Sequence, residues 1–415
     1  MVFGLFGGEA NITQMLLSLL MLMAFFIFFP RLMAFQMIYK IRKSLKVIQK
    51  NALEAEEMFL SSIAEKPNED LKEDLEPMKN MVISPPSNLD PSGMFEKLEN
   101  VLDSSQDKVE RYVESLNPEM DEEKKADMKM AFQGVYGANQ IYVMIRHFKK
   151  LIEDTNNYQI GQMIQMMLPL YKELSESQKK ATEAFVNNVP IGDSVGPLIA
   201  AKLTENEPEE KAENIMVSEE DLDGEKYVVV QSKGPGSRLG KYGDALEEIV
   251  EDNDVEKILT LDAGMRYEGE ETGTIVEGSG VMMGGPGVEK GKIEEVAVEN
   301  DLPLEGYIVK QSGPQASKPM HKKIWNAHEN VIRKVRDDIR NSEGKLLIIG
   351  VGNTCGIANT REDVEGVENK LNPYWLKQEE ETTSYYGLMR AFPVGGSQER
   401  NRSENSFQLF QSIVR

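Results

Sequence analysis

The chain has 415 residues, which is enough for two or three domains with a sizeable core. It contains 47 basic and 69 acidic residues, and the formal net charge of −22 argues against a nucleic-acid partner, because neutralising phosphates requires clustered Lys and Arg. Cys355 is the only cysteine, which excludes a disulfide framework and a cysteine-based zinc site. Since the chain has only three histidines, we expect no metal and no cofactor.

An uncharged segment, ITQMLLSLLMLMAFFIFFP, runs from Ile12 to Pro30. A helix of this length can cross the roughly 30 Å hydrocarbon layer of a membrane. Basic residues follow it from Arg31 onward but none precedes it, so the positive-inside rule places the short N-terminus outside and the C-terminal domains in the cytoplasm. A signal peptide is the alternative, but its basic leader and small-residue cleavage site are missing. We therefore expect a single-pass protein of the cell membrane, anchored in the lipid bilayer by residues 1–43 with a span at about 12–30.

Residues 44–190 have apolar side chains at the spacing of amphipathic helices, with one break at SPPSNLDPSG, Ser84–Gly93. The many methionines in this region could form an adaptable docking surface or an ordinary core. We expect a helical bundle that joins the anchor to the rest of the protein.

Two polar segments are expected to lack regular structure. Residues 204–224 are rich in Glu and poor in apolar residues, which is typical of an exposed loop or linker, with an acidic tail for a partner as the alternative. The C-terminal extension, residues 374–415, is expected to be partly disordered.

Residues 191–373 alternate between short apolar runs and helical segments. The runs are Lys226–Ser232, Glu256–Gly264, Leu304–Ser312 and Lys345–Asn353, and the helical segments are Asp244–Asp252, Val288–Glu299 and Lys318–Ile339. Strands buried on both faces and alternating with helices predict a three-layer α/β head with a doubly wound, mostly parallel sheet. In such a sheet, ligands bind at the carboxyl ends of the strands.

The stretch GDSVGPLIAAKL places Asp193 between glycines directly before an apolar helix. It resembles the Asp-x-x-Gly-Pro turn and helix of the spore germination proteases, whose fold also houses the hydrogenase-maturation endopeptidases. The order of the segments downstream is similar as well, with a strand ending in LDAG and then GSGVMMGGPG. This resemblance covers Ile191–Ser312 and implies a phosphorylase/hydrolase-like fold. The chain also resembles an uncharacterised family of archaeal membrane-anchored proteins, which implies no activity.

The order of one motif differs from that of the proteases. In those relatives a Gly-x-Gly-Asn strand comes directly before the Asp turn, whereas here LLIIGVGN lies near the C-terminal end of the head. We therefore predict a circular permutation that brings Gly350–Asn353 beside Asp193 in space.

The resemblance implies that Asp193 and Asp262 act as a catalytic acid–base pair on an unknown protein or peptide substrate. Two carboxyl groups that share a proton can activate a water and protonate a leaving amine. The backbone and side-chain groups that could bind the ligand or a developing oxyanion are Gly192, Gly196, Gly284, Gly285, Gly287, Gly352 and Asn353.

Plainer interpretations stay open. Asp193 could merely cap its helix, and Asp262 could close a turn at the end of a strand. Lys233 and Arg238, together with Lys241 and Lys318, could instead make the glycine-rich loops a non-catalytic site for a small anion. His321, the one histidine placed to join a metal site, is more typical of a helix start. A scaffold that assembles into a homo-oligomer is the third alternative.

Overall fold

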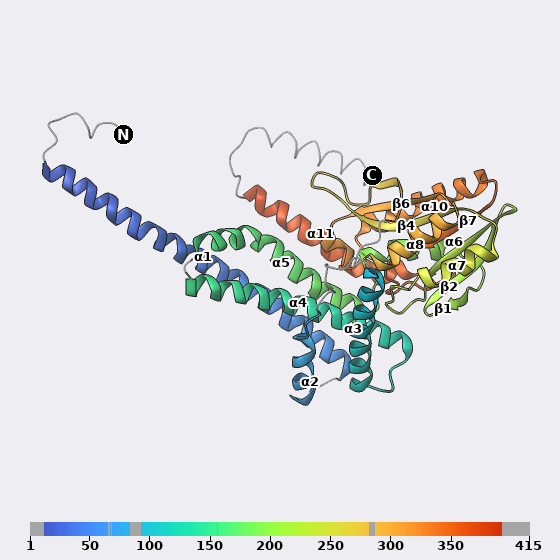
Figure 1. Cartoon of the computed structure of the whole chain (residues 1–415), viewed down its shortest axis with the longest axis horizontal. Helices are drawn as coiled ribbons and strands as arrows, with labels where there is room; N and C mark the ends of the chain where they lie inside the picture. The colour runs from blue at the N-terminus through green and yellow to red at the C-terminus, as the bar shows by residue number, and fades with distance from the viewer. Residues whose placement is uncertain are drawn as a thin grey trace. The chain divides into compact units, whose positions relative to one another are not determined.

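The fold is that of a computed structural model, which describes residues 12–64, 67, 69–83, 93–155, 157–281 and 287–391 (Figure 1). The chain divides into a large unit that ends at Val367 and a C-terminal unit that begins at Glu368. In the second unit the structure describes the rest of helix α11 (Val367–Ala391). Residues 392–415, which belong to the extension expected to be partly disordered, lie outside the described residues.

The N-terminal part of the large unit is helical. Its helices are α1 (Ile12–Ile63), α2 (Glu69–Lys79), α3 (Met94–Leu116), α4 (Glu122–Thr155) and α5 (Tyr158–Val186). A core between α1, α4 and α5 contains pairs of isoleucines seven residues apart, such as Ile41 and Ile48, because positions two turns apart lie on one face of a helix. These helices occupy the region in which the apolar spacing predicted them.

The structure corrects the prediction of a membrane anchor. Among the helices in the described ranges, none has an apolar segment long enough to cross a membrane. Helix α1 continues without a break from Ile12 to Ile63, and its C-terminal half packs into the bundle core. The single-pass architecture and the cell-membrane localisation expected from the sequence are therefore wrong for this structure.

The head contains a seven-stranded sheet in the order β1-β2-β3-β7-β4-β6-β5. The strands are β1 (Glu209–Ala212), β2 (Ile215–Leu222), β3 (Glu225–Ser232), β4 (Val255–Met265), β5 (Ile275–Ser279), β6 (Leu304–Gln311) and β7 (Lys345–Gly350). The four central strands β3, β7, β4 and β6 are parallel, and β1, β2 and β5 add antiparallel edges. The sheet is therefore mixed, which corrects the prediction of a mostly parallel one.

The antiparallel edge explains the error at residues 204–224, which were expected to form a loop. They fold into β1 and β2, joined by a turn at Asn214, whose φ is 59°. The first half of β2 is buried at Ile215 and Val217, while Glu219 and Asp221, which follow at the same two-residue spacing, are exposed. The strand thus has buried apolar residues at its start and exposed acidic residues toward its end, and its overall composition conceals this division.

Helices cover both faces of the sheet. On one face, α7 (Gly243–Asp252) and α8 (Val288–Glu299) share a core with alternate residues of the central strands, including Val228 and Leu347. On the other face lie α6 (Val195–Leu203) and α10 (Lys322–Asn341), where Tyr227 of β3 donates a 2.7 Å hydrogen bond to the carbonyl of Leu203. This arrangement is the expected three-layer α/β head.

Candidate active site

Asp193 lies in a single 3₁₀ turn, η1 (Gly192–Ser194), which leads directly into α6. Two glycines allow this turn to rest on the carboxyl ends of the central strands. A Cβ on Gly196 would overlap the carbonyl oxygens of Leu261 in β4 and Val351 after β7. Gly352, whose φ is 135°, would in the same way overlap the carbonyl of Asp193 itself. The glycines around Asp193 thus serve the close approach of backbones, which no larger residue permits.

The side chain of Asp193 bonds outside its own helix. The backbone N–H of Asn353 donates to Oδ2 of Asp193 at 2.9 Å. The predicted proximity of Gly350–Asn353 to Asp193 is therefore confirmed, and the carboxyl group does not serve as a simple cap of α6. Asp193 keeps part of its surface accessible to solvent, although many protein atoms surround its carboxyl group.

Asp262 lies inside β4, opposite Ile308 of β6, and the strand continues to Met265. It is therefore not part of a strand-end turn. The side chain is only 3% exposed. Its Oδ1 accepts the amide of Ala263 at 2.6 Å, while its Oδ2 bonds to none of the residues that the structure describes.

Burial raises the pKa of both carboxyl groups, because the charged form loses water. At Asp193 the amide of Asn353 opposes this shift by stabilising the charge. At Asp262 the nearby charge of Asp193 adds to burial and lifts the pKa well above its ordinary value. The repulsion between the two charges is mutual, so the pair loses its first proton at Asp193, which the Asn353 amide stabilises, and Asp262 holds its proton to higher pH.

Tyr242, just before α7, is a third buried group near the pair, and the sequence did not single it out. Its hydroxyl donates to the carbonyl of Gly350 at 2.7 Å and lies 2.8 Å from Oγ of Ser232. Burial raises the pKa of Tyr242 further above its ordinary value, and the charges of both aspartates add to the effect. The hydroxyl therefore stays protonated and fixes the end of β7.

Several buried polar atoms at the same ends of the strands make no hydrogen bond to the described residues. They are Oε1 of Gln231, both side-chain atoms of Gln311, Nδ2 of Asn353 and Oδ2 of Asp262. Buried polar groups in proteins are normally paired, so these atoms still require partners such as an ordered water or a small polar ligand. Gln311 also contacts the Asp193 turn, since a Cβ on Gly192 would overlap its Oε1. A sequence pattern indicates Gln231 and Gln311: a Gln-Ser pair ends both YVVVQS and YIVKQS.

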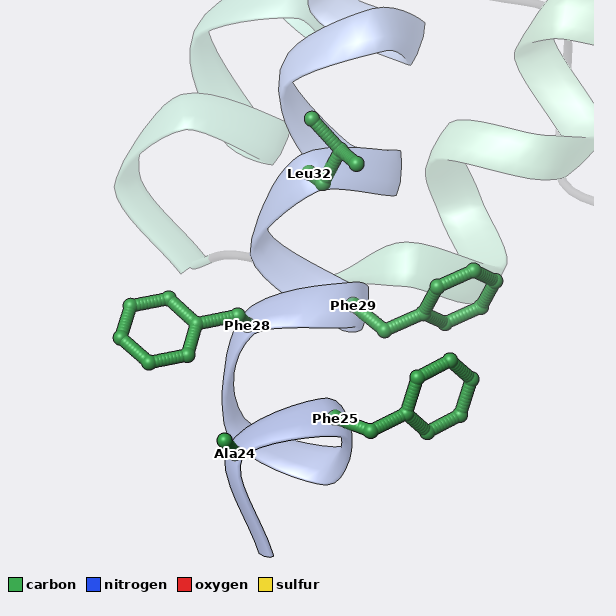
Figure 2. Close-up of a pocket in the computed structure, with 5 residues that line it drawn as sticks. All are labelled: Ala24, Phe25, Phe28, Phe29 and Leu32. Carbon is green, nitrogen blue, oxygen red and sulfur yellow. The ribbon is translucent and has the colours of Figure 1, made fainter. Parts of the chain in front are cut away.

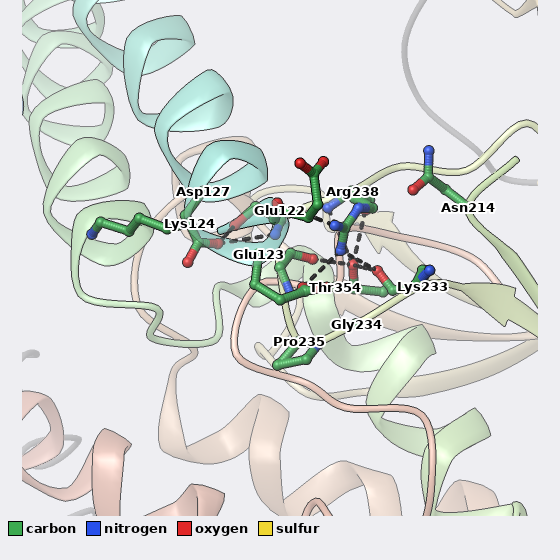
Figure 3. A network of polar contacts seen from close by, with 12 residues as sticks. Glu122, Glu123, Lys124, Asp127, Asn214, Lys233, Gly234, Pro235, Arg238 and Thr354 are labelled. Atoms are coloured by element: carbon green, nitrogen blue, oxygen red, sulfur yellow. Dashed lines mark hydrogen bonds and ion pairs between the residues drawn. The ribbon is translucent and has the colours of Figure 1, made fainter. Parts of the chain in front are cut away.

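The basic residues of the predicted anion site are engaged elsewhere. Lys233 forms an ion pair with Glu210 at 2.6 Å. Arg238 bonds to Glu123 at 2.7 Å, at the start of α4 (Figure 3). Lys241 pairs with Asp103 of α3 at 3.0 Å. The structure therefore does not gather these side chains around the acid pair.

Three further glycines, Gly284, Gly285 and Gly287, were predicted to bind the ligand. Gly284 and Gly285 lie outside the described residues. Gly287 precedes α8 with a φ of 86°, and no heavy atom lies within 4 Å of a Cβ built on it. It therefore serves the entry into the helix.

His321 occupies the N-cap of α10, where its Nδ1 accepts the amide of Lys323 at 3.1 Å. The described ranges contain no cluster of three His, Cys, Asp or Glu side chains of the kind that holds a metal ion.

A separate hollow lies on the flank of α1 and is lined by Ala24, Phe25, Phe28, Phe29 and Leu32 (Figure 2). The rings of Phe25 and Phe29 stack with their centroids 4.7 Å apart. Because all five lining residues are apolar, this hollow offers no group for acid–base chemistry.

Two family models match adjoining parts of the chain. Residues 15–188 match "Protein of unknown function (DUF1512) N-terminal domain", and residues 191–358 match "Domain of unknown function (DUF1512) C-terminal". No curated protein and no solved structure matches the chain significantly. These comparisons therefore lend no support to the resemblance to the spore germination proteases.

Proposed function

The chain belongs to the DUF1512 family, whose models leave its function open, and we propose from the site itself that it is an amide hydrolase. On this proposal Asp193 and Asp262 form the catalytic acid–base pair. The substrate is a peptide or another small molecule with an amide bond.

The observation that carries the proposal is the state of Asp262. A carboxyl oxygen that is buried without a hydrogen bond costs a protein about 1–3 kcal/mol, so a purely structural role would favour an apolar residue or an asparagine here. The Asp262 carboxyl group lies near a second acid, Asp193, at the end of the sheet where ligands of α/β proteins bind. Strongly shifted pKa values of this kind gather at catalytic sites.

The order of ionisation assigns the roles. Asp193, which ionises first, is the general base: it takes a proton from a water whose oxygen forms a bond to the amide carbon. Asp262, which keeps its proton, is the general acid and gives that proton to the leaving nitrogen as the C–N bond breaks. Afterwards Asp193 is protonated and Asp262 is charged, and exchange of a proton with solvent restores the pair.

The unpaired amide groups fit a substrate that contains an amide. Nδ2 of Asn353 can donate to the oxygen on which negative charge develops. Gln311 has both a free donor and a free acceptor, which match the C=O and N–H of one peptide group. An uncharged amide substrate therefore satisfies the polar atoms that the described residues leave unpaired.

A site for a small anion, the rival interpretation, has less support. Lys233, Arg238 and Lys241 are held in ion pairs with acidic side chains. Two aspartates at the strand ends would also repel an anion once Asp193 is charged.

The test is cleavage of a mixed peptide library, with products identified by mass spectrometry. The wild-type protein should cut a subset of peptides, and Asp193→Asn and Asp262→Asn should each lose this activity. Asp338→Asn is the matched control, because Asp338 accepts the Tyr307 hydroxyl at 2.8 Å on α10 and takes no part in the pair. No cleavage by the wild-type protein, or cleavage that survives in either site variant, would overturn the proposal.

A further inference from the structure

The loop that carries Asn353 is held from the helical part of the chain. Asp127 of α4 is 3% exposed, and its Oδ1 accepts the backbone N–H of Ser237 at 2.9 Å and the Ser237 hydroxyl at 2.6 Å. Its Oδ2 accepts Nδ2 of Asn188, which also donates to the carbonyl of Pro235. One buried carboxylate thus ties α4 to the loop of residues 233–238 (Figure 3).

Glu123 adds a second tie one helical turn earlier. Its carboxylate accepts the guanidinium of Arg238 at 2.7 Å and also the backbone N–H of Gly236. The Arg238 side chain is only 12% exposed, so this charged bond is better shielded from water than an ordinary surface ion pair.

The 233–238 loop in turn holds Thr354, which is fully buried. The Thr354 hydroxyl accepts the backbone N–H of Arg238 at 3.1 Å and donates to the carbonyl of Gly236 at 2.7 Å. The backbone N–H of Thr354 donates to the carbonyl of Arg238 at 3.1 Å. This residue is therefore fixed on both sides by the loop that α4 holds.

Thr354 directly follows Asn353, whose backbone N–H donates to Asp193. Asn353 is locked further by its own Oδ1, which accepts the N–H of Cys355 at 2.9 Å. A series of hydrogen bonds, linked by the backbone of the 233–238 loop and by the peptide bond between Asn353 and Thr354, thus leads from α4 to the carboxyl group of Asp193.

We propose that Asp127 and Glu123 are positioning residues for the acid pair: through Ser237, Arg238 and Thr354 they hold the Asn353 amide against Asp193. The helical domain thereby controls the general base of the head. The role of these residues in catalysis rests on the proposed function. Their effect on the hydrogen bond between Asn353 and Asp193 does not depend on it.

Two substitutions break this series of hydrogen bonds and leave the side-chain volume nearly unchanged. Asp127→Asn places an NH₂ group against the NH₂ of Asn188, so the bond between these residues is lost. Thr354→Val keeps the shape of the side chain but removes the hydroxyl and its bonds to the loop. Each change frees the Asn353 amide to move away from Asp193, which removes a bond that stabilises the charged carboxylate.

The experiment uses the full chain with ¹³C-labelled aspartate carboxyls, assigned by Asp→Asn substitutions and titrated by NMR. The pKa of Asp193 should rise in Asp127→Asn and in Thr354→Val, and it should not change in the control Asp338→Asn. Should Asp127→Asn fail to fold, Ser237→Ala, which removes only the hydroxyl bond to Asp127, takes its place with a smaller rise expected.

An unchanged pKa of Asp193 in the folded variants would overturn the positioning role. The outcome is independent of hydrolysis. A rise in the pKa of Asp193 in a protein that cleaves no peptide supports the positioning and rejects the proposed function.

Discussion

The backbone N–H of Asn353 and the Oδ2 of Asp193 lie 2.9 Å apart, in a hydrogen bond that joins residues 160 positions apart in the sequence. This bond places the end of the last central strand against the turn before α6. It also stabilises the charge of Asp193, so that this carboxyl group ionises before Asp262. The two acids thereby acquire different protonation states, which is what a general base and a general acid require.

Asp262→Asn should stabilise the protein at neutral and alkaline pH. The folded protein keeps a proton on Asp262 at pH values where the unfolded chain, with a pKa near 3.8, has lost it. The folded state then binds more protons, so the free energy of unfolding falls as the pH rises from 3.8 through the raised pKa of the folded state. Asparagine keeps the bond to the Ala263 amide and carries no charge.

Thermal melts at pH 4 and pH 8 measure this effect. We expect the variant to gain about 1–3 kcal/mol over the wild-type protein at pH 8 and much less at pH 4. An equal difference between the two proteins at both pH values would contradict a raised pKa of Asp262.

Gly196→Ala should destabilise the head, because the added methyl group would overlap the carbonyls of Leu261 and Val351. Neither carbonyl can retreat easily, since the Leu261 carbonyl accepts the N–H of Val351 at 2.9 Å. We expect a loss of about 1–3 kcal/mol or more in chemical denaturation. The matched control is Gly313→Ala at the start of α9 (Gly313–Ala316), where an added Cβ meets no atom within 4 Å and should cost less than about 0.5 kcal/mol. Equal losses in the two variants would show that the turn does not rest on the strands.

The central strands and the helices that flank them were predictable from the sequence for a physical reason. A strand buried on both faces needs an unbroken apolar run, and KLLIIG in β7 is such a run. The antiparallel strands β1 and β2 lack this signal: β2 is only partly buried, and its acidic content led to the prediction of a loop. Apolar content also led to the prediction of a membrane span at Ile12–Pro30, whereas none of the helices in the described ranges meets the length and hydropathy of a span.

The candidate site was predictable only in part. A glycine-flanked aspartate before a helix and an aspartate near the end of an apolar run are local patterns, and both residues lie at the strand ends. Asp127 and Tyr242 carry no such pattern, since their contacts depend on how distant segments pack. The ion pairs of Lys233 and Arg238 could not be predicted for the same reason: their partners, Glu210 and Glu123, cannot be inferred from the neighbouring sequence.

His321→Ala should weaken α10 most at neutral pH. Burial and the positive charge of Lys323 lower the pKa of His321, so the neutral ring accepts the Lys323 amide. As the pH falls from 6.5 through the lowered pKa, the unfolded chain binds a proton before the folded state does, and the contribution to stability is lost.

Denaturation at pH 8 and pH 5 checks this account of the cap. The alanine variant should lose about 1 kcal/mol at pH 8 and less at pH 5. His321→Asn should preserve the cap at both pH values, because its side-chain oxygen accepts the amide without titrating. A loss in His321→Ala that is the same at pH 5 and pH 8 would argue against a cap made by the neutral ring.

The most direct test of the acid pair is the carboxyl titration of Asp262, followed by ¹³C NMR in the wild-type protein and in Asp193→Asn. We predict that Asp262 titrates well above 3.8 in the wild-type protein, and that its pKa falls in the variant, which removes the charge of Asp193, while burial keeps it above the ordinary value. A pKa of Asp262 that is the same in both proteins, or that lies at its ordinary value, would contradict the coupling between the two acids on which the proposed function depends.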